Sequence, residues 1–374
     1  HQASVFRAIA RYLRQVRSRF TVYSMSVTLT RYPAIVGNLW KLFEARFDPS
    51  IKNRDAKQKQ LIGLIETALN DIESSDDDRI IQHYLEVIRA MLRTNFYQQL
   101  LPRKSAMGAE APAPVLTFKI DPSAVGIMPQ PVPYRELFVS SPVVEGLHLR
   151  FGPVARGGLR WSDRAQDYRT EVLGLVKAQQ VKNAVIVPVG SKGGFVPKDL
   201  PTGDRNAFFE AGRSAYQVFI SSLLSVTDNL VDGKVVTPTN TICHDGDDPY
   251  FVVAADKGTS TFSDTANEIS QAYDFWLDDA FASGGSAGYD HKKMGITARG
   301  AWEAVKRHFR EMDRDIQTQP FTACGVGDMS GDVFGNGMLL SKQTRLIAAF
   351  DHRDIFIDPD PDPVTSFAER QRLF

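Results

Sequence analysis

One segment, residues 156–198, constrains the fold of this chain more than any other. It begins with the glycine pair of RGG and ends close to the pair of SKGG, and the sequence between them predicts a helix that leads into a short apolar strand. We expect a tight backbone turn at each end, because glycine adopts backbone conformations that other residues avoid. Cations accompany both glycine pairs, at Arg156, Arg160, Lys177, Lys182 and Lys192. The combination predicts a pocket for a small dianion in which one lysine does chemistry.

The composition is that of an ordinary globular chain. Of the 374 residues 43% are apolar and 24% are charged, and the net charge is zero, so nothing points to a nucleic-acid or membrane partner. Two widely separated cysteines, Cys243 and Cys324, argue against a disulfide scaffold and favour a reducing cytoplasm. Because the chain starts at His1 and stops abruptly at Phe374, we expect a piece of a longer polypeptide.

The sequence pattern changes from helical to mixed near residue 110. Apolar spacing predicts helices over residues 1–100, the last of them ending near Phe96, and LPRKSAMGAEAPAP is typical of a linker. The segments VLTFKI, RELFVSS and EGLHLRF predict strands. Further strands, among them AVIVPV and an apolar strand ending at Asp256, then alternate with helices, one of which we expect Ser263 or Asp264 to cap. This alternation indicates the α/β class.

Two polar clusters invite a metal-site interpretation that the sequence does not favour. The acids at residues 76–78 stand directly before a helical pattern, where the helix dipole favours negative charge, so we interpret them as a helix start. Cys243-His244-Asp245 lacks a second ligand group at metal spacing. We therefore predict no metal site.

Near the C-terminus a strand, a glycine-rich turn and a helix are predicted in FTACGVGDMSGDVFGNGMLL. This order suits a dinucleotide pyrophosphate. Gly325 and Gly327 fit the usual pattern, but Ser330 takes its third position and Gly331 follows one residue later. The next strand ends at Asp351, where an acid suits a ribose diol and repels a 2′-phosphate, which favours NAD over NADP. The alternative is a structural glycine turn in another α/β fold.

Lys192 is the residue best suited to chemistry, because it follows a buried strand in GSKGG. A lysine that is partly desolvated and near other cations would have a depressed pKa and could act as an acid, a base or a water activator. Arg156 can grip a carboxylate bidentately, Lys182 can face the same pocket, and Asp256 can transfer protons. Each also has a structural explanation: a surface arginine, a lysine complementing a helix dipole, and a turn aspartate.

The motifs RGGLRWS, GSKGG, AADKG and GITARG together resemble those of the glutamate dehydrogenase superfamily, and the long stretches around them are similar to the large, NAD-specific bacterial glutamate dehydrogenases. The resemblance implies a helical segment packing on the catalytic region at residues 1–110, an α/β substrate-binding domain at 111–314, and the first part of a Rossmann-type NAD-binding domain at 315–374, truncated at its C-terminus. It also implies a cytoplasmic homo-oligomer with regulatory regions elsewhere in a longer chain.

The same resemblance assigns roles to single residues. Lys192 matches the catalytic lysine, and Asp256 matches the aspartate that shuttles protons at the amino group. Lys182 and Gln179 match residues that hold the substrate α-carboxylate. Arg156, followed by Gly157 and Gly158, falls where the small enzymes place a lysine for the side-chain carboxylate, which favours a dicarboxylate substrate. The residues expected at the cofactor are Thr297, Gly325, Gly327, Asp328, Ser330, Gly331 and Asp351.

The activity expected from these assignments is NAD-dependent oxidative deamination of L-glutamate to 2-oxoglutarate and ammonia, a step of amino-acid catabolism. One alternative is another amino-acid dehydrogenase of the superfamily, which a substrate panel distinguishes. A second is a non-catalytic regulatory or assembly module that retains the fold, which an assay of glutamate-dependent NADH production distinguishes.

Overall fold

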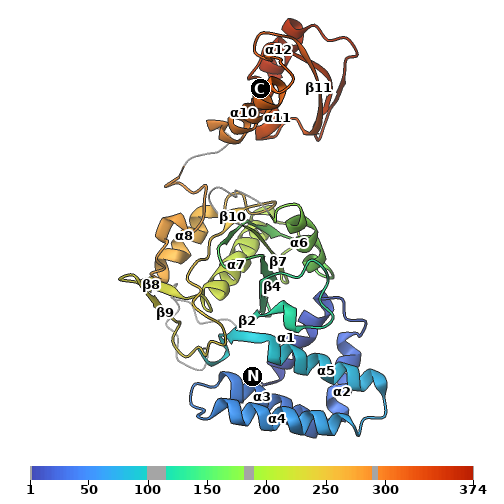
Figure 1. Ribbon diagram of the computed structural model, residues 1–374, viewed down its shortest axis with the longest axis vertical. Helices are drawn as coiled ribbons and strands as arrows, with labels where there is room; N and C mark the ends of the chain where they lie inside the picture. The colour runs from blue at the N-terminus through green and yellow to red at the C-terminus, as the bar shows by residue number, and fades with distance from the viewer. Residues whose placement is uncertain (1, 99–114, 181–188, 289–293, 374) are drawn as a thin grey trace. The chain divides into compact units, whose positions relative to one another are not determined.

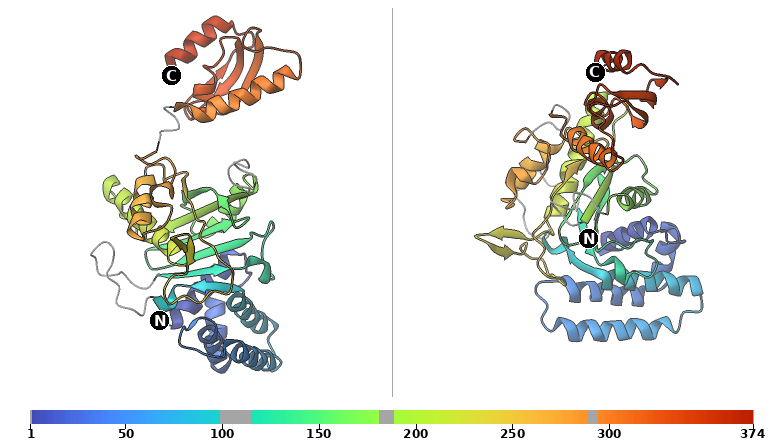
Figure 2. Two further views of the ribbon diagram at one scale, coloured as in Figure 1. Left: turned by 60° about the vertical axis from the view of Figure 1, so that its left-hand side comes forward. Right: turned by 45° about the horizontal axis from the view of Figure 1, so that its top comes forward.

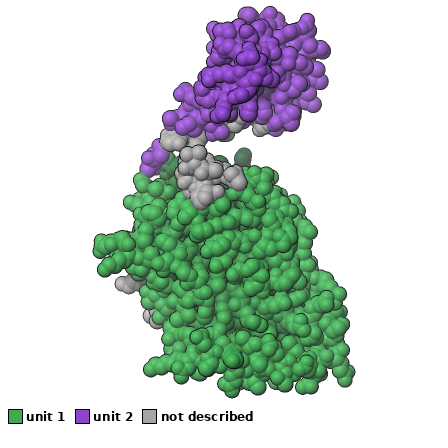
Figure 3. All heavy atoms as spheres, viewed as in Figure 1, with its two compact units in different colours: residues 1–285 green, residues 286–374 purple. Residues whose placement is uncertain are grey.

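The computed structural model describes residues 2–98, 115–180, 189–288 and 294–373 (Figure 1). The chain forms two compact units, residues 1–285 and 286–374 (Figure 3). The domain boundary proposed after residue 314 therefore falls inside the second unit. Within the described ranges, no helix is both long and apolar enough to cross a membrane.

The first unit opens with helices, as predicted for residues 1–100: α1 (Gln2–Gln15), α2 (Val22–Arg31), α3 (Pro33–Phe47), α4 (Arg54–Leu69) and α5 (Ser75–Ala90). The three acids at residues 76–78 lie in the first turn of α5, which confirms the helix start. The predicted end of this helix near Phe96 is wrong. It ends at Ala90, because the next four residues extend and pair with a later strand.

The first unit contains a mixed sheet of eight strands: β1 (Met91–Thr94), β2 (Leu116–Ile120), β3 (Arg135–Ser140), β4 (Val144–Arg150), β5 (Ala155–Arg156), β6 (Gly158–Trp161), β7 (Val189–Pro197) and β10 (Ala254–Ala255). Their order is β1-β2-β3-β4-β7-β6-β10, with β5 also paired to β7. Pairing is antiparallel from β1 to β7 and parallel among β7, β6 and β10. The predicted strands at β2, β3 and β4 are confirmed.

Helices cover both faces of this sheet (Figure 2). Alternate side chains of a strand point to opposite faces, so Phe138 packs with the N-terminal helices and α6 (Tyr168–Lys177), whereas Leu137 and Val139 pack against α7 (Arg205–Leu224) and α8 (Ser263–Ala272). A small hairpin, β8 (Asn229–Val231) and β9 (Lys234–Val236), lies outside the main sheet. Three short 3₁₀ helices, η1 (Phe96–Gln98), η2 (Pro122–Ala124) and η3 (Asp278–Ala280), complete the unit's described elements.

Neither glycine pair of residues 156–198 forms the tight turn that we expected. Gly193 and Gly194 lie inside β7, and Gly158 begins β6. A Cβ on Gly193 would stand 2.3 Å from Leu159 Cδ2, and one on Gly157 would stand 1.6 Å from the backbone oxygen of Ser191. The glycines are needed for close packing between neighbouring strands, not for chain reversal. Of the predicted strand AVIVPV, residues 184–188 lie outside the described residues.

Two further predictions need correction near α8. The strand expected to end at Asp256 is only two residues long, because the preceding Val253 pairs with Ala282 and donates its backbone N–H to the carbonyl of Phe281 instead of extending the pairing with β6. Phe262, and not Ser263 or Asp264, occupies the N-cap position of α8, since the chain is already helical from Ser263.

The second unit has a three-stranded sheet, ordered β11 (Phe321–Asp328), β12 (Thr344–Phe350) and β13 (Ile355–Ile357). The first two strands are parallel and the last pair is antiparallel. Its helices are α10 (Ile296–Arg310), the short α11 (Asp332–Gly337) and α12 (Pro363–Leu373). Trp302, Ile316 and Phe321 form the buried core. The order of strand, glycine-rich connection, helix and strand agrees with the sequence prediction, and the α/β class is confirmed.

A buried network of charges fixes the largely irregular chain between α7 and β10. Arg93 of β1 donates to Asp228 and Asp245, Lys119 of β2 pairs with Asp245 and Asp248, and Arg150 of β4 pairs with Asp248. Arg93, Lys119 and Asp228 are each only 1% exposed. Burial alone would raise the pKa of Asp248, but Arg150 and Lys119 outweigh it and lower that pKa to about 2. Asp245 of the Cys-His-Asp cluster is therefore structural.

We predict that Asp248→Asn destabilises the first unit by about 3–5 kcal/mol, because it removes the carboxylate that pairs with the buried Arg150 and leaves Lys119 with Asp245 alone. Urea denaturation gives the free energy of unfolding. Glu66→Gln is the control: Glu66 pairs with Arg89 at 3.8 Å on the surface, where such a pair contributes about 0–1 kcal/mol. Equal losses in the two variants would contradict the role given to the network.

Candidate active site

The strand order brings Lys192 and Asp256 into direct contact. Strand β6 lies between β7 and β10 and is parallel to both, with Leu159 opposite Gly193 on one side and Ala255 on the other. Lys192 precedes Gly193 and Asp256 follows Ala255, and the Lys192 ammonium forms an ion pair with the Asp256 carboxylate. Lys192 is 4% exposed. The two residues expected to be catalytic are thus in contact, with Lys192 buried and Asp256 partly exposed, although they are distant in sequence.

A second cation also contacts Asp256. Arg160 Nε lies 3.4 Å from Asp256 Oδ2, and Arg160 Nη1 lies 3.0 Å from Glu171 Oε1. Burial alone would raise the pKa of Asp256, but the hydrogen bond and charge of Lys192, the backbone N–H of Lys257 and the Arg160 side chain lower it below its ordinary value. Asp256 is therefore held as a carboxylate.

Sequence reasoning listed Arg160 only among the cations of its segment and overlooked Glu171. The available signal was weak: an arginine two residues after a glycine pair, and an acid in the first turn of the next predicted helix. Only the fold brings these two side chains together.

The predicted substrate-binding residues lie beside the same strand. Arg156 pairs with Gly190 across β5 and β7, and its Nη2 donates to Ser283 Oγ at 2.9 Å. The backbone N–H of Gly190 donates to the carbonyl of Gln180 at 2.8 Å, which places the residues that follow α6 next to β7. The Oε1 atom of Gln179 is buried and has no hydrogen-bond partner among the described residues. Lys182 lies outside the described residues.

Gly157 and Gly158 have a packing role. A Cβ at Gly158 would stand 2.8 Å from the carbonyl oxygen of Ala255, and the corresponding atom at Gly157 would overlap Ser191. The glycine pair thus lets β6 approach both strands that carry the candidate catalytic residues.

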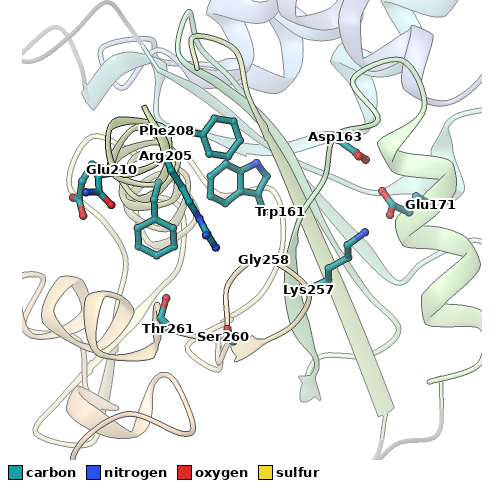
Figure 4. Close-up of a pocket in the computed structure, with 12 residues that line it drawn as sticks. Trp161, Asp163, Glu171, Arg205, Phe208, Glu210, Lys257, Gly258, Ser260 and Thr261 are labelled. Atoms are coloured by element: carbon teal, nitrogen blue, oxygen red, sulfur yellow. The ribbon is translucent and has the colours of Figure 1, made fainter. Parts of the chain in front are cut away.

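A pocket of about 610 Å³ lies between the segment around Trp161 and the segment around Lys257 (Figure 4). Its lining includes Trp161, Lys257 and Glu171, which are sequence neighbours or bonding partners of Arg160 and Asp256. The indole of Trp161 stacks on the ring of Phe208 with their centroids 5.3 Å apart. Neither Lys192 nor Asp256 is among the residues that line this pocket.

The second unit holds the predicted cofactor residues. Gly325, Gly327 and Asp328 lie in β11, Ser330 and Gly331 follow it, and Thr297 lies exposed in the first turn of α10. Gly327 has a φ of 146°, and a Cβ there would stand 2.5 Å from Phe334 Cε2, so only glycine fits. Gly327 is therefore needed for the close packing of Phe334 of α11 against β11.

Asp351 directly follows β12, where the sequence placed it. Its Oδ1 accepts hydrogen bonds from the backbone N–H groups of Arg353 at 2.7 Å and Asp354 at 2.8 Å. These bonds lower the pKa of Asp351, which stays ionised as a ribose-binding acid requires. In the part of the chain that the structure describes, no cluster of His, Cys, Asp and Glu is suited to hold a metal ion.

Comparison with known proteins matches nearly the whole chain. Residues 64–374 match the family model described as bacterial NAD-glutamate dehydrogenase, catalytic domain, and residues 1–49 match glutamate dehydrogenase, helical motif 3. The chain is 56% identical over 374 residues to an NAD-specific glutamate dehydrogenase of Halomonas elongata, covering 100% of this chain and 23% of that protein.

Two further relatives agree with this match. The NAD-specific glutamate dehydrogenase of Pseudomonas aeruginosa is 55% identical over 376 residues, covering 99% of this chain and 23% of that protein. That of Mycobacterium tuberculosis is 55% identical over 385 residues, covering 100% and 23%. The chain therefore spans less than a quarter of the length of the curated relatives it matches.

We predict that Gly157→Ala lowers the free energy of unfolding by about 1–3 kcal/mol or more, because its methyl group would force the backbone of β7 to move. Gly174→Ala is the matched control. Gly174 lies in α6, where an added Cβ would have nothing within 4 Å, and alanine should stabilise the helix by about 0.5–1 kcal/mol. Urea denaturation compares the two, and a Gly157→Ala chain as stable as wild type would contradict the packing argument.

Proposed function

The chain belongs to the family of bacterial NAD-glutamate dehydrogenases, and on this premise we propose that it forms the catalytic region of an enzyme that converts L-glutamate, water and NAD to 2-oxoglutarate, ammonia and NADH. The observation that carries the proposal is the contact between the buried Lys192 and the partly exposed Asp256. A carboxylate held beside an ammonium group supplies both a proton acceptor and a proton donor at one point.

Substrate binding is assigned to residues around β7. Arg156 binds the side-chain carboxylate of glutamate, while Lys182 and Gln179 hold the α-carboxylate and orient Cα. The assignment of Gln179 is supported by its buried Oε1, which has no partner among the described residues, because such an atom costs about 1–3 kcal/mol unless a ligand satisfies it. When both carboxylates of the substrate are bound, its Cα is held in a fixed orientation for the reaction.

Proton transfer is assigned to the Lys192–Asp256 pair. The Asp256 carboxylate accepts a proton from the substrate ammonium, which leaves a neutral amine whose lone pair expels the α-hydrogen as hydride. Bound NAD supplies the acceptor for that hydride. Loss of the hydride leaves an iminium ion. Lys192 then positions a water molecule that attacks the iminium carbon and loses one proton to solvent. Asp256 returns its proton to the nitrogen, and ammonia leaves as the new hydroxyl group loses its proton to solvent and the carbonyl of 2-oxoglutarate forms.

NAD binding is assigned to the second unit. The bare backbone at Gly325, Gly327 and Gly331, with Asp328 and Ser330 between them, takes the pyrophosphate, and Asp351 takes a ribose diol. Thr297 is assigned to the nicotinamide carboxamide.

Cytoplasmic location, amino-acid catabolism and a homo-oligomeric assembly with regulatory regions of a longer chain are also part of this proposal. They follow from the family resemblance. The two cysteines support a reducing compartment, since both Cys243 and Cys324 are free thiols.

We predict that Lys192→Ala in the full-length enzyme lowers kcat for glutamate by about 10²–10⁴-fold, the usual contribution of a general acid or base. NAD affinity should not change. Steady-state NADH formation and NAD titration measure the two quantities. Lys177→Ala is the control, because Lys177 is exposed at the end of α6 and should keep full activity. Near-normal kcat in Lys192→Ala would exclude the catalytic assignment.

We predict that Arg156→Leu weakens glutamate far more than leucine. Loss of a charged hydrogen bond worth about 1.5–3 kcal/mol lowers kcat/KM for glutamate by about 10–150-fold, whereas leucine has no second carboxylate to lose. Arg156→Lys keeps the cation and should retain part of the preference. A substrate panel on the full-length enzyme measures these ratios, and equal losses for both amino acids would argue against the specificity role.

A further inference from the structure

Arg160 stands on the face of the sheet that carries Lys192. In β6, Leu159 packs into the core beside α7, so its neighbour Arg160 points to the opposite face, toward α6. In β7, a Cβ on Gly194 would meet Val172 of α6, and Lys192 shares the face of Gly194 because the two are two residues apart. The parallel pairing of β6 with β7 and β10 therefore places the guanidinium beside the Lys192–Asp256 pair.

Glu171 fixes the other side of this guanidinium. Its Oε1 accepts from Arg160 Nη1 at 3.0 Å, and its Oε2 accepts from Ser162 Oγ at 2.6 Å. With both carboxylate oxygens bonded, Glu171 has little freedom to turn away. Because a guanidinium is a rigid planar fork, holding Nη1 also directs Nε, the atom that lies 3.4 Å from Asp256.

We infer that Arg160, itself oriented by Glu171, is a positioning residue that keeps the Asp256 carboxylate in place and ionised when substrate draws Lys192 away from it. The inference rests on the proposed function, in which Asp256 takes the ammonium proton. Without Arg160, Asp256 would depend on Lys192 alone for a side-chain cation, and Lys192 must turn to the water that attacks the imine.

The charges around Asp256 determine the expected pH dependence. Lys192 faces it from β7, Arg160 from β6 and the backbone N–H of Lys257 from the following loop, while the negative charge of Glu171 on α6 lies behind Arg160. All three donors favour the ionised form. Removing Arg160 therefore raises the pKa of Asp256, and the acidic limb of the kcat profile, where Asp256 must lose its proton, moves to higher pH.

The test uses the full-length enzyme with Arg160→Gln, Arg160→Lys and the control Arg164→Gln, whose arginine pairs on the surface with Asp167. Arg160→Gln should lower kcat on the order of 10²-fold, the scale of a misplacement of about 1 Å, with unchanged KM for glutamate and an acidic limb at higher pH. Arg160→Lys should restore the position of that limb, because it restores the charge. Arg164→Gln should match wild type.

Glu171→Gln tests whether Glu171 acts through Arg160. The double variant Arg160→Gln/Glu171→Gln should lose no more kcat than Arg160→Gln alone, since groups that act as one unit are not additive. Additive losses would overturn the proposed pairing.

The outcomes separate this inference from the proposed function. Wild-type enzyme without glutamate-dependent NADH formation would overturn both. Active wild type together with an Arg160→Gln variant of unchanged kcat would overturn the inference alone. The inference would also be overturned if Arg160→Gln lowered kcat without moving the acidic limb and Arg160→Lys did not restore kcat. That pattern indicates a purely structural role for Arg160.

Discussion

The placement of the candidate catalytic pair, Lys192 and Asp256, depends on the buried charges of Arg93, Lys119 and Arg150 with their aspartates. Buried ions are stable only when every charge is paired, so this network admits one arrangement of the irregular chain that precedes β10. Arg150 also donates to the carbonyl of Tyr250 at 3.0 Å. The residues that follow Tyr250, among them Phe251 and Val253, are buried in the core. The chain then pairs with β6 through β10, and Asp256 follows that strand. Arg150 stands opposite Ser191 in the next strand, which carries Lys192, so the network and the pair share one framework.

The N-terminal helices contact the candidate active site indirectly, because α1 forms hydrogen bonds with the beginning of α6. Gln15 of α1 donates to the carbonyl of Ala165 and accepts from the backbone N–H of Arg169 at 3.2 Å each. Arg169 and Glu136 of β3 form an ion pair at 2.8 Å, with side chains 1% and 0% exposed. These contacts fix the beginning of α6, where Glu171 lies. A helical segment without a candidate catalytic residue therefore helps to set the position of Arg160.

The local patterns of this sequence predicted its elements well, but the reasons for its glycines came from the fold. Periodicity predicted the helical character of residues 1–100 and located the strands β2 to β4, since those elements bury one repeating face. The same local reasoning took Gly193 as a turn residue, whereas its role is set by Leu159 on a neighbouring strand. The bond between Arg93 and Asp245 joins residues 152 positions apart, and no spacing rule detects such a pair.

The two cations that contact Asp256, Lys192 and Arg160, differ in how firmly the fold holds them. Both contact Oδ2, yet they come from different strands and differ in their remaining bonds. Arg160 is held on its other side by Glu171, whereas Lys192 has a flexible four-carbon side chain whose ammonium can exchange partners. In the proposed reaction, Asp256 loses its contact with Lys192 while Arg160 remains, and a remaining cation favours the ionised form of the carboxylate. The rigid arginine would then keep Asp256 in position while the adaptable lysine changes partners.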